Sequence, residues 1–296
     1  DKIRRHRLWQ KQTEDGVKSN SLAACNMVCT PKKNGGLGVI NLRIQHEALL
    51  LKFLHKFYNR HDIPWVHLIW DSYYGDTIPH TLDSCGSFWW KDLIHLMPTY
   101  RGVTRIKIGN GSSALFWKDN WSQSIYAETC PRAYSYAIVE DISVKHLLTS
   151  TDLHETFHLP LSIQARDELH NIQAEVAMIT PVPADDTWQC VWGDNNFHTS
   201  SYYKFYFREV VAHEAFGWLW KAKCIPKIKV FGWFLLADRL NTRNMLKRRH
   251  FNIGYTFGCL LCPTCMDETV EHLFFECPFS LNCWAKLGMQ GSTQGN

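Results

Sequence analysis

The chain has 296 residues, of which 45% are hydrophobic and 20% are charged, so it can bury a core and is not a disordered polymer. Its longest apolar run, residues 230–237, has eight residues, whereas a membrane-spanning helix needs roughly 20. The first nine residues are basic and carry no apolar stretch, so we expect no signal peptide and an intracellular location, in the nucleus or the cytoplasm. The formal net charge of +4 excludes nothing by itself.

Charge is unevenly distributed along the chain. Residues 221–250 contain nine basic residues and one acidic residue, whereas residues 34–220 contain 14 basic and 20 acidic residues. The first 33 residues are also basic, with eight basic and three acidic residues. A positive stretch of this density is a candidate contact for a polyanion, which the net charge alone does not reveal.

Besides a short helix through Leu148 that Asp141 or Ser143 caps, three helices are predicted in the first two thirds of the chain. Apolar residues recur at helical spacing over residues 42–58, and we expect this helix to be buried in the protein's own core. A shorter helix is predicted over residues 87–97, where Pro98 follows. Ser162 is a suitable N-cap for a third helix that ends near Met178.

A small β-ribbon is predicted between the second and third of these helices, over residues 103–117. Ile106 and Ile108 alternate with basic residues, as in a half-buried strand. The dipeptide Asn110-Gly111 that follows is a preferred two-residue hairpin turn. The pattern therefore predicts a local hairpin in which the two strands are neighbours in sequence.

A proline-rich linker is predicted after the third helix. Residues 180–183 read Thr-Pro-Val-Pro and precede Asp185-Asp186, the one Asp-Asp pair in the chain. Proline and aspartate at this density favour turns, so we expect both carboxylates to be solvated. This stretch is the strongest candidate for a domain boundary.

Beyond residue 187 the predicted elements are mostly helical. Each begins at a recognisable start signal: Ser200 or Ser201 for a helix through Val211, Pro226 for a helix through Ala237, and Thr242 for a short basic helix to Arg249. The fold class is therefore predicted to be α+β and predominantly α-helical. A small β-ribbon lies in the middle, and a helical domain with a structural zinc site lies at the C-terminus.

The zinc site is predicted from the cysteines. The chain has 11 of them, and five lie between residues 259 and 283. Two Cys-x2-Cys pairs overlap there, Cys259/Cys262 and Cys262/Cys265, and His272 and Cys277 follow. Either pair completes a Cys3His set of the kind that binds structural zinc, and spacing alone does not choose between them. Four protein ligands leave no open position for water, so a catalytic zinc is not expected. Asp267 is a plausible cap for a helix that carries His272.

The basic stretch directly precedes these ligands and contains interleaved aromatic residues. Basic side chains neutralise phosphates and aromatic rings stack on bases, so the stretch predicts binding of RNA or DNA. The alternative is a solvated face of amphipathic helices, and individually we expect Trp218, Trp220, Phe231 and Trp233 to lie in the core. The predicted nucleic-acid contacts are Lys221, Lys223, Lys227, Lys229, Arg239, Arg243, Lys247, Arg248 and Arg249.

The C-terminal region resembles a known domain. Residues 268–280 read Glu-Thr-Val-Glu-His-Leu-Phe-Phe-Glu-Cys-Pro-Phe-Ser, and Trp220, Pro226 and Trp233 precede them at matching places. These residues are similar to the zinc-binding domain at the C-terminal end of plant LINE-type, non-LTR retrotransposon reverse transcriptases. Residues 28–38 and 108–119 are similar to segments between the polymerase core and this domain.

The resemblance implies a ligand set, a division of the chain and a function. It favours Cys259, Cys262, His272 and Cys277 as ligands and leaves Cys265 as a bystander. It implies a post-polymerase helical region over 1–83, a connecting region over 84–186 and the zinc-binding domain over 187–296. Polymerase, endonuclease and ribonuclease H motifs are absent from this sequence, so we expect a non-catalytic chain whose partners are RNA or DNA and the parent polymerase, without a membrane. A protein-interaction module and a degenerate remnant are the alternatives.

Overall fold

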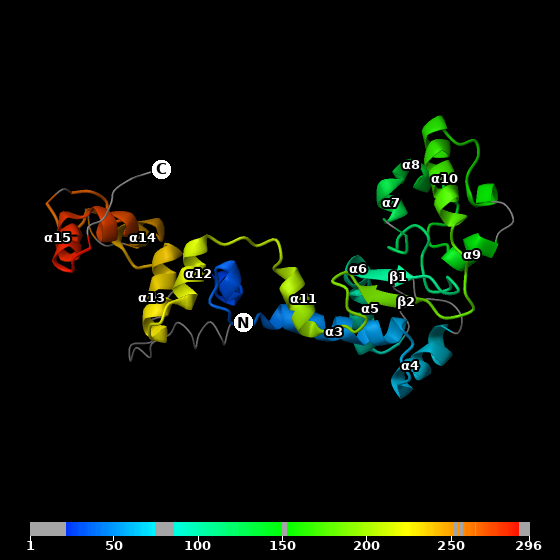
Figure 1. The fold of residues 1–296 in the computed structure, drawn as a ribbon, viewed down its shortest axis with the longest axis horizontal. Coiled ribbons are helices and arrows are strands. Elements are labelled where there is room, and N and C mark those ends of the chain that lie inside the picture. Colours follow the sequence, from blue (N-terminus) through cyan, green and yellow to red (C-terminus); the bar gives the residue numbers. More distant parts are fainter. Residues whose placement is uncertain are drawn as a thin grey trace. The chain divides into compact units, whose positions relative to one another are not determined.

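The computed structural model describes residues 22–74, 86–122, 124–149, 153–251, 254, 257–263 and 265–289. These residues fold into two compact units (Figure 1). The first unit is discontinuous, because the chain up to residue 42 packs with residues 207 onward, and the second unit comprises residues 43–206. The predicted division into three consecutive segments stays a prediction. In the structure, the second unit lies in sequence between the two parts of the first unit. None of the helices in the described ranges combines the length and apolar character that a bilayer crossing requires.

The second unit is mainly helical around a two-stranded sheet. Its helices are short apart from two, α3 (Leu42–Tyr58) and α10 (Ile163–Val176). The remaining elements are α4 (Pro64–Ile69), η2 (Trp70–Tyr74), α5 (Phe88–His95), α6 (Met97–Gly102), β1 (Thr104–Lys107), α7 (Tyr126–Thr129), α8 (Pro131–Tyr134), α9 (Val144–Thr149), η3 (Leu153–Thr156), β2 (Thr187–Cys190) and α11 (Thr199–Tyr206).

Side-chain caps confirm two of the predicted helix starts in this unit. Ser87 accepts a hydrogen bond from the backbone N–H of Trp90 (3.3 Å) at the start of α5, and Ser162 accepts one from Ala165 (3.1 Å) at the start of α10. The predicted cap at Ser200 or Ser201 is wrong, because α11 begins at Thr199 and ends at Tyr206.

The burial of α3 follows only part of the apolar set that predicted the helix, since Leu54 and Phe57 of that set are buried. Leu42, Leu49 and Phe53 are exposed, although they belong to the apolar set that predicted the helix. The buried stripe contains Ile44, Ala48, Leu51, Leu54 and Phe57. Helical spacing alone does not distinguish two adjacent stripes when apolar residues occupy both.

The sheet contradicts the predicted local hairpin. Strand β1 pairs with β2 in antiparallel register, so that Ile106 lies opposite Trp188, some 80 residues later in the chain. Residues 108–113 instead form an irregular loop, and Leu115 makes an isolated bridge with Ser143. The chain does bend at Asn110-Gly111. The strand that pairs with β1, however, follows the predicted linker.

The loop after β1 closes around the carboxylate of Asp186, which was predicted to be solvated. Asp186 is 4% exposed. It accepts hydrogen bonds from the backbone N–H groups of Gly109 (2.7 Å), Gly111 (2.8 Å) and Ser113 (2.7 Å) and from the Ser113 hydroxyl (2.8 Å). The Ser113 hydroxyl in turn accepts the indole N–H of Trp188 (3.1 Å). The prediction of a solvated carboxylate is therefore wrong for Asp186, because its charge is satisfied by hydrogen bonds within the unit.

An aromatic stack forms the centre of this core. The rings of Tyr58 and Tyr100 stack 5.2 Å apart, and Trp188 packs against both. Arg101 lies over the Tyr58 and Trp188 rings and pairs with the buried carboxylate of Asp119 (2.5 Å). Tyr58, Arg101 and Trp188 come from α3, α6 and β2, so these contacts join the three elements. Removing either partner of the buried pair would leave an uncompensated charge.

The first unit joins a short N-terminal segment to the C-terminal helices. Its elements are α2 (Cys25–Cys29), η1 (Lys32–Asn34), α12 (Glu214–Lys221), α13 (Pro226–Leu236), α14 (Arg243–Arg248), η4 (His272–Glu276) and α15 (Pro278–Lys286). Helices α12 and α13 lie side by side, next to the N-terminal segment (Figure 1). Pro226 begins α13 as predicted, and the hydroxyl of Thr242 accepts from Met245 N–H (3.2 Å) to cap α14.

Trp233 holds this unit together. Its side chain is fully buried and packs with Ala23 and Val28 from the N-terminal segment and with the inner faces of α12 and α13. Its indole N–H donates to the carbonyl of Gly35 (2.8 Å). Gly35 has a φ of +88°, a left-handed conformation that favours glycine, and a Cβ there would lie 3.1 Å from that of Ala212.

We predict that Asp186→Asn lowers the free energy of unfolding by about 2–4 kcal/mol. The substitution replaces an acceptor of four hydrogen bonds by an amide that cannot accept all of them. Asp185→Asn is the matched control, because Asp185 is exposed and makes only a long contact with Arg60 (3.9 Å), so we expect a change below about 0.5 kcal/mol. Urea denaturation measures both variants, and equal effects would contradict the assigned role of Asp186.

Candidate metal centre and basic surface

Cys259 and Cys262 lie on a hairpin turn. Gly258 and Asp267 form an antiparallel bridge at its base, and the backbone N–H of Cys259 donates to the carbonyl of Met266 (2.8 Å). The N–H of Leu261 points at the Cys259 sulfur (3.4 Å). Backbone N–H groups directed at a sulfur stabilise the thiolate form that binds metal, so the turn is suited to a metal ligand.

His272 and Cys277 lie on one face of a helical turn of unusual width. The backbone N–H of Cys277 donates to the carbonyl of His272 (2.7 Å), which is a hydrogen bond across five residues and defines the π-helical segment η4. This wider turn brings residues five apart to one side, whereas an α-helix does so for residues four apart. The helix is capped by Thr269, whose hydroxyl accepts from His272 N–H (3.0 Å), so the predicted cap at Asp267 is wrong.

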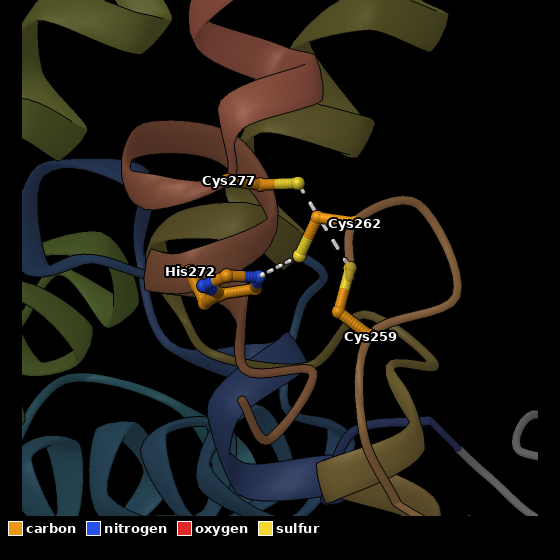
Figure 2. A group of neighbouring side chains, drawn as sticks. All are labelled: Cys259, Cys262, His272 and Cys277. Carbon is orange, nitrogen blue, oxygen red and sulfur yellow. Dashed lines mark hydrogen bonds between the residues drawn. The ribbon is translucent and has the colours of Figure 1, made fainter. Parts of the chain in front are cut away.

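The four side chains converge (Figure 2). Their ligand atoms lie within 4.8 Å of one another, with 3.9 Å between the sulfurs of Cys259 and Cys277 and 3.3 Å between Cys262 Sγ and His272 Nε2. A tetrahedral zinc with Zn–S bonds of about 2.3 Å places its sulfurs about 3.8 Å apart. The sulfurs of Cys259 and Cys277 are too far apart for a disulfide, and all described cysteines are free. The donor set and its spacing therefore fit a structural zinc.

The four ligand side chains are largely shielded from solvent. Cys259, His272 and Cys277 are buried and Cys262 is half-buried. Burial raises the pKa of the Cys259 thiol. The carboxylate of Glu276 lies 3.9 Å from Nδ1 of His272, the nitrogen that faces away from Cys262, and so favours a proton on that nitrogen. Nε2 is then unprotonated, and its lone pair points toward the cluster as a metal ligand.

Cys265, the alternative ligand, lies outside the cluster. Its side chain is exposed and its sulfur is nearest the carbonyl of Pro263 (3.7 Å). Its backbone adopts a left-handed conformation, with φ of +52°, which directs the chain back into the hairpin. Cys283 is also exposed, on α15.

The basic residues that precede the cluster fall into two groups. The first group makes contacts within its own unit. Lys229 donates to the carbonyl of Trp220 (2.9 Å), Arg239 contacts the sulfur of Met27 (3.7 Å), and the backbone N–H of Arg243 donates to the Glu268 carboxylate (3.1 Å).

Helix α14 supplies the rest of this first group. Lys247 pairs with Asp267 (3.8 Å), Arg248 pairs with Asp238, and Arg249 donates to the carbonyl of Leu22. Burial, together with Arg239 and Arg248, lowers the pKa of the Arg249 guanidinium. These side chains help to attach α14 and the zinc hairpin to the rest of the unit, a role that the charge pattern did not reveal.

The second group comprises Lys221, Lys223 and Lys227. All three are exposed, and none has an ion-pair or hydrogen-bond partner among the residues that the structure describes. They lie at the corner where α12 ends and α13 begins. Lys32, from the N-terminal segment, lies over the ring of Trp220 on α12, with its Nζ 4.8 Å from the ring centroid. Lys32 is not among the nucleic-acid contacts predicted from the sequence. Its only signal was the basic character of the first 33 residues.

The aromatic residues of this region also divide. Trp233 is buried, as predicted, and Trp220 is half-buried in the same cluster. The predicted core position is wrong for Trp218 and Phe231, which are 66% and 47% exposed. Phe231 faces the zinc-site helix, where its ring lies 6.2 Å from that of Phe274.

Together, the Cys3His cluster and the short helices around it define a zinc-binding domain. Residues 197–284 match the family model for zinc-binding in reverse transcriptase, and this range contains all four clustered residues. The chain is also similar to a putative ribonuclease H protein of Arabidopsis thaliana, with 23% identity over 315 residues. The alignment covers 100% of this chain and 48% of that protein, so the chain spans about half the length of this relative. No solved structure matches the chain.

We predict one zinc ion per chain. Cys262→Ser and Cys265→Ser form a matched pair three residues apart on the same turn. We expect Cys262→Ser, like Cys277→Ser and His272→Ala, to lose the zinc and to melt the C-terminal helices, because structural zinc binding is coupled to folding. We expect Cys265→Ser to retain it.

Elemental analysis of the purified chain and its circular dichroism test this assignment. The expected result is a zinc-to-protein ratio near one for the wild type and for Cys265→Ser. Retention of zinc by Cys277→Ser, or its loss from Cys265→Ser, would contradict the ligand set.

Proposed function

We propose that this chain is the non-catalytic, nucleic-acid-binding C-terminal part of a LINE-type retrotransposon reverse transcriptase. In this proposal Cys259, Cys262, His272 and Cys277 hold a structural zinc. RNA or DNA binds at the basic surface, in the nucleus or the cytoplasm, and the parent polymerase is a further partner. The family match over residues 197–284 supports a retroelement-related zinc-binding region.

The observation that carries nucleic-acid binding is the group of free lysines at the α12–α13 corner. Lys221, Lys223 and Lys227 are exposed, and the single acidic residue of the basic stretch, Asp238, is paired with Arg248. Three ammonium groups without a counterion among the described residues are available to phosphates. The other predicted contacts contribute to the positive potential of this surface, while their partners hold them in place.

We predict that the triple variant Lys221→Glu/Lys223→Glu/Lys227→Glu loses most of its affinity for nucleic acid. Each phosphate contact contributes about 0.7–0.9 to the slope of log affinity against log salt, so the slope should fall by about 2. The matched control is Lys91→Glu/Lys107→Glu/Lys145→Glu, which makes the same charge change at exposed lysines of the second unit. Arg243 and Arg248 are less suitable, since their substitution also removes contacts within the protein.

Mobility-shift titrations at several salt concentrations measure both triple variants. We expect the control to keep a near wild-type slope. The absence of any shift by the wild-type chain at low salt, or equal losses in both triple variants, would refute nucleic-acid binding at this surface.

Exposed apolar side chains on η4, on α15 and at the end of α15 favour a second candidate function, a zinc-stabilised protein-interaction module. Phe275, Phe279 and Leu287 are each more than half exposed, close to the zinc cluster in sequence. Surfaces of this kind mark protein contacts when they are contiguous. A pull-down of the parent polymerase that survives high salt and nuclease treatment, and that Phe279→Ala abolishes, would support this function.

A further inference from the structure

Trp218 is an exposed indole on α12, a helix whose other large apolar side chains are partly buried. Its neighbours on α12, Phe216, Leu219 and Trp220, all pack against the cluster around Trp233. Trp218 is 66% exposed and makes no ring contact or hydrogen bond through its side chain among the described residues. A tryptophan left in water forgoes the burial of one of the largest apolar surfaces available to a side chain. Its exposure therefore calls for a reason outside the packing of this helix.

The lysines without partners follow this indole in the sequence, at the end of α12 and the start of α13. Lys221 follows Trp218 by three residues, so that both project from the same face of α12. Lys223 lies in the turn that follows, and Lys227 lies in the first turn of α13. Glu214 shares the Trp218 face one turn earlier, at the N-terminus of α12, where a carboxylate is favoured by the helix dipole. The positive charge is thus concentrated on one side of the indole, toward the α12–α13 corner.

Phe231 provides an internal comparison. It lies in the same basic stretch and is also partly exposed, but its ring packs against Phe274 next to the zinc cluster. Its exposure is explained by its position at the edge of an intramolecular contact. Trp218, which directly precedes the basic stretch, has no such partner among the described residues, so its ring face is available to a ligand.

We infer that Trp218 is a base-stacking residue and that, with Lys221, Lys223 and Lys227, it forms a strip that prefers single-stranded over double-stranded nucleic acid. This inference rests on the proposed function and specifies its ligand. Unpaired bases expose their faces and can stack on an indole while adjacent phosphates reach the lysines. In a duplex the base faces are occupied by their neighbours, and only the phosphates remain available.

The test compares two labelled probes against the full chain at fixed salt. One probe is a 20-nucleotide oligodeoxythymidine, and the other is a 20-nucleotide self-complementary hairpin with the same number of phosphates. A stacked base contributes enough to affinity that Trp218→Ala should weaken single-strand binding by about 5- to 100-fold, while hairpin binding changes less than about twofold. Trp218→Phe keeps a ring and should retain most of the single-strand affinity, whereas Trp218→Leu keeps apolar bulk without a ring and should not.

Phe279→Ala is the matched control, because Phe279 is an exposed aromatic residue of the same unit that lies outside the basic stretch. Zinc content and the thermal midpoint establish that each variant is folded, and Trp218→Leu separates a loss of the ring from a loss of packing. If the wild type binds both probes and Trp218→Ala leaves single-strand affinity unchanged, or weakens both probes equally, the stacking inference is wrong and the proposed function stands. If the wild type binds neither probe, the proposed function fails and the inference fails with it.

Discussion

The Cys3His cluster is the interaction on which the C-terminal part of the chain depends. Among the described residues from 238 to 289, only Thr242, Met245, Cys259, His272 and Cys277 are buried, and three of these five belong to the cluster. So few apolar side chains cannot offset the conformational entropy of about fifty residues. A metal that joins the hairpin to helix η4 takes the place of a hydrophobic core, as in other small metal-binding domains.

The zinc hairpin is connected to the basic surface through charged side chains. Lys247 pairs with Asp267 on the hairpin, and Glu268 accepts the backbone N–H of Arg243, so α14 is attached directly to the metal-binding turn. Arg249 reaches back to the N-terminal segment at Leu22. Much of the basic stretch therefore serves to assemble the unit. The lysines at the α12–α13 corner are left for an external anion, which narrows the proposed interface from nine residues to a few.

The discontinuous first unit is built from segments that lie far apart in the sequence. Trp233 is buried only because residues 23–28 and the carbonyl of Gly35 come back from the opposite end of the sequence. In the second unit, Asp186 returns in the same way to the loop at residues 109–113. Both contacts join segments far apart in sequence, and each uses a buried polar group that must be satisfied within the fold.

The sequence by itself determined the features that depend on near neighbours. These include the helix starts at Ser87, Ser162, Pro226 and Thr242, because a cap or a first-turn proline acts within one turn, and a Cys3His set at zinc-ligand spacing. Only the tertiary structure decided that β1 pairs with β2, that Asp186 is buried and that Trp218 is exposed. Those outcomes depend on which distant segment packs against each element. Local periodicity and residue spacing do not predict such long-range contacts.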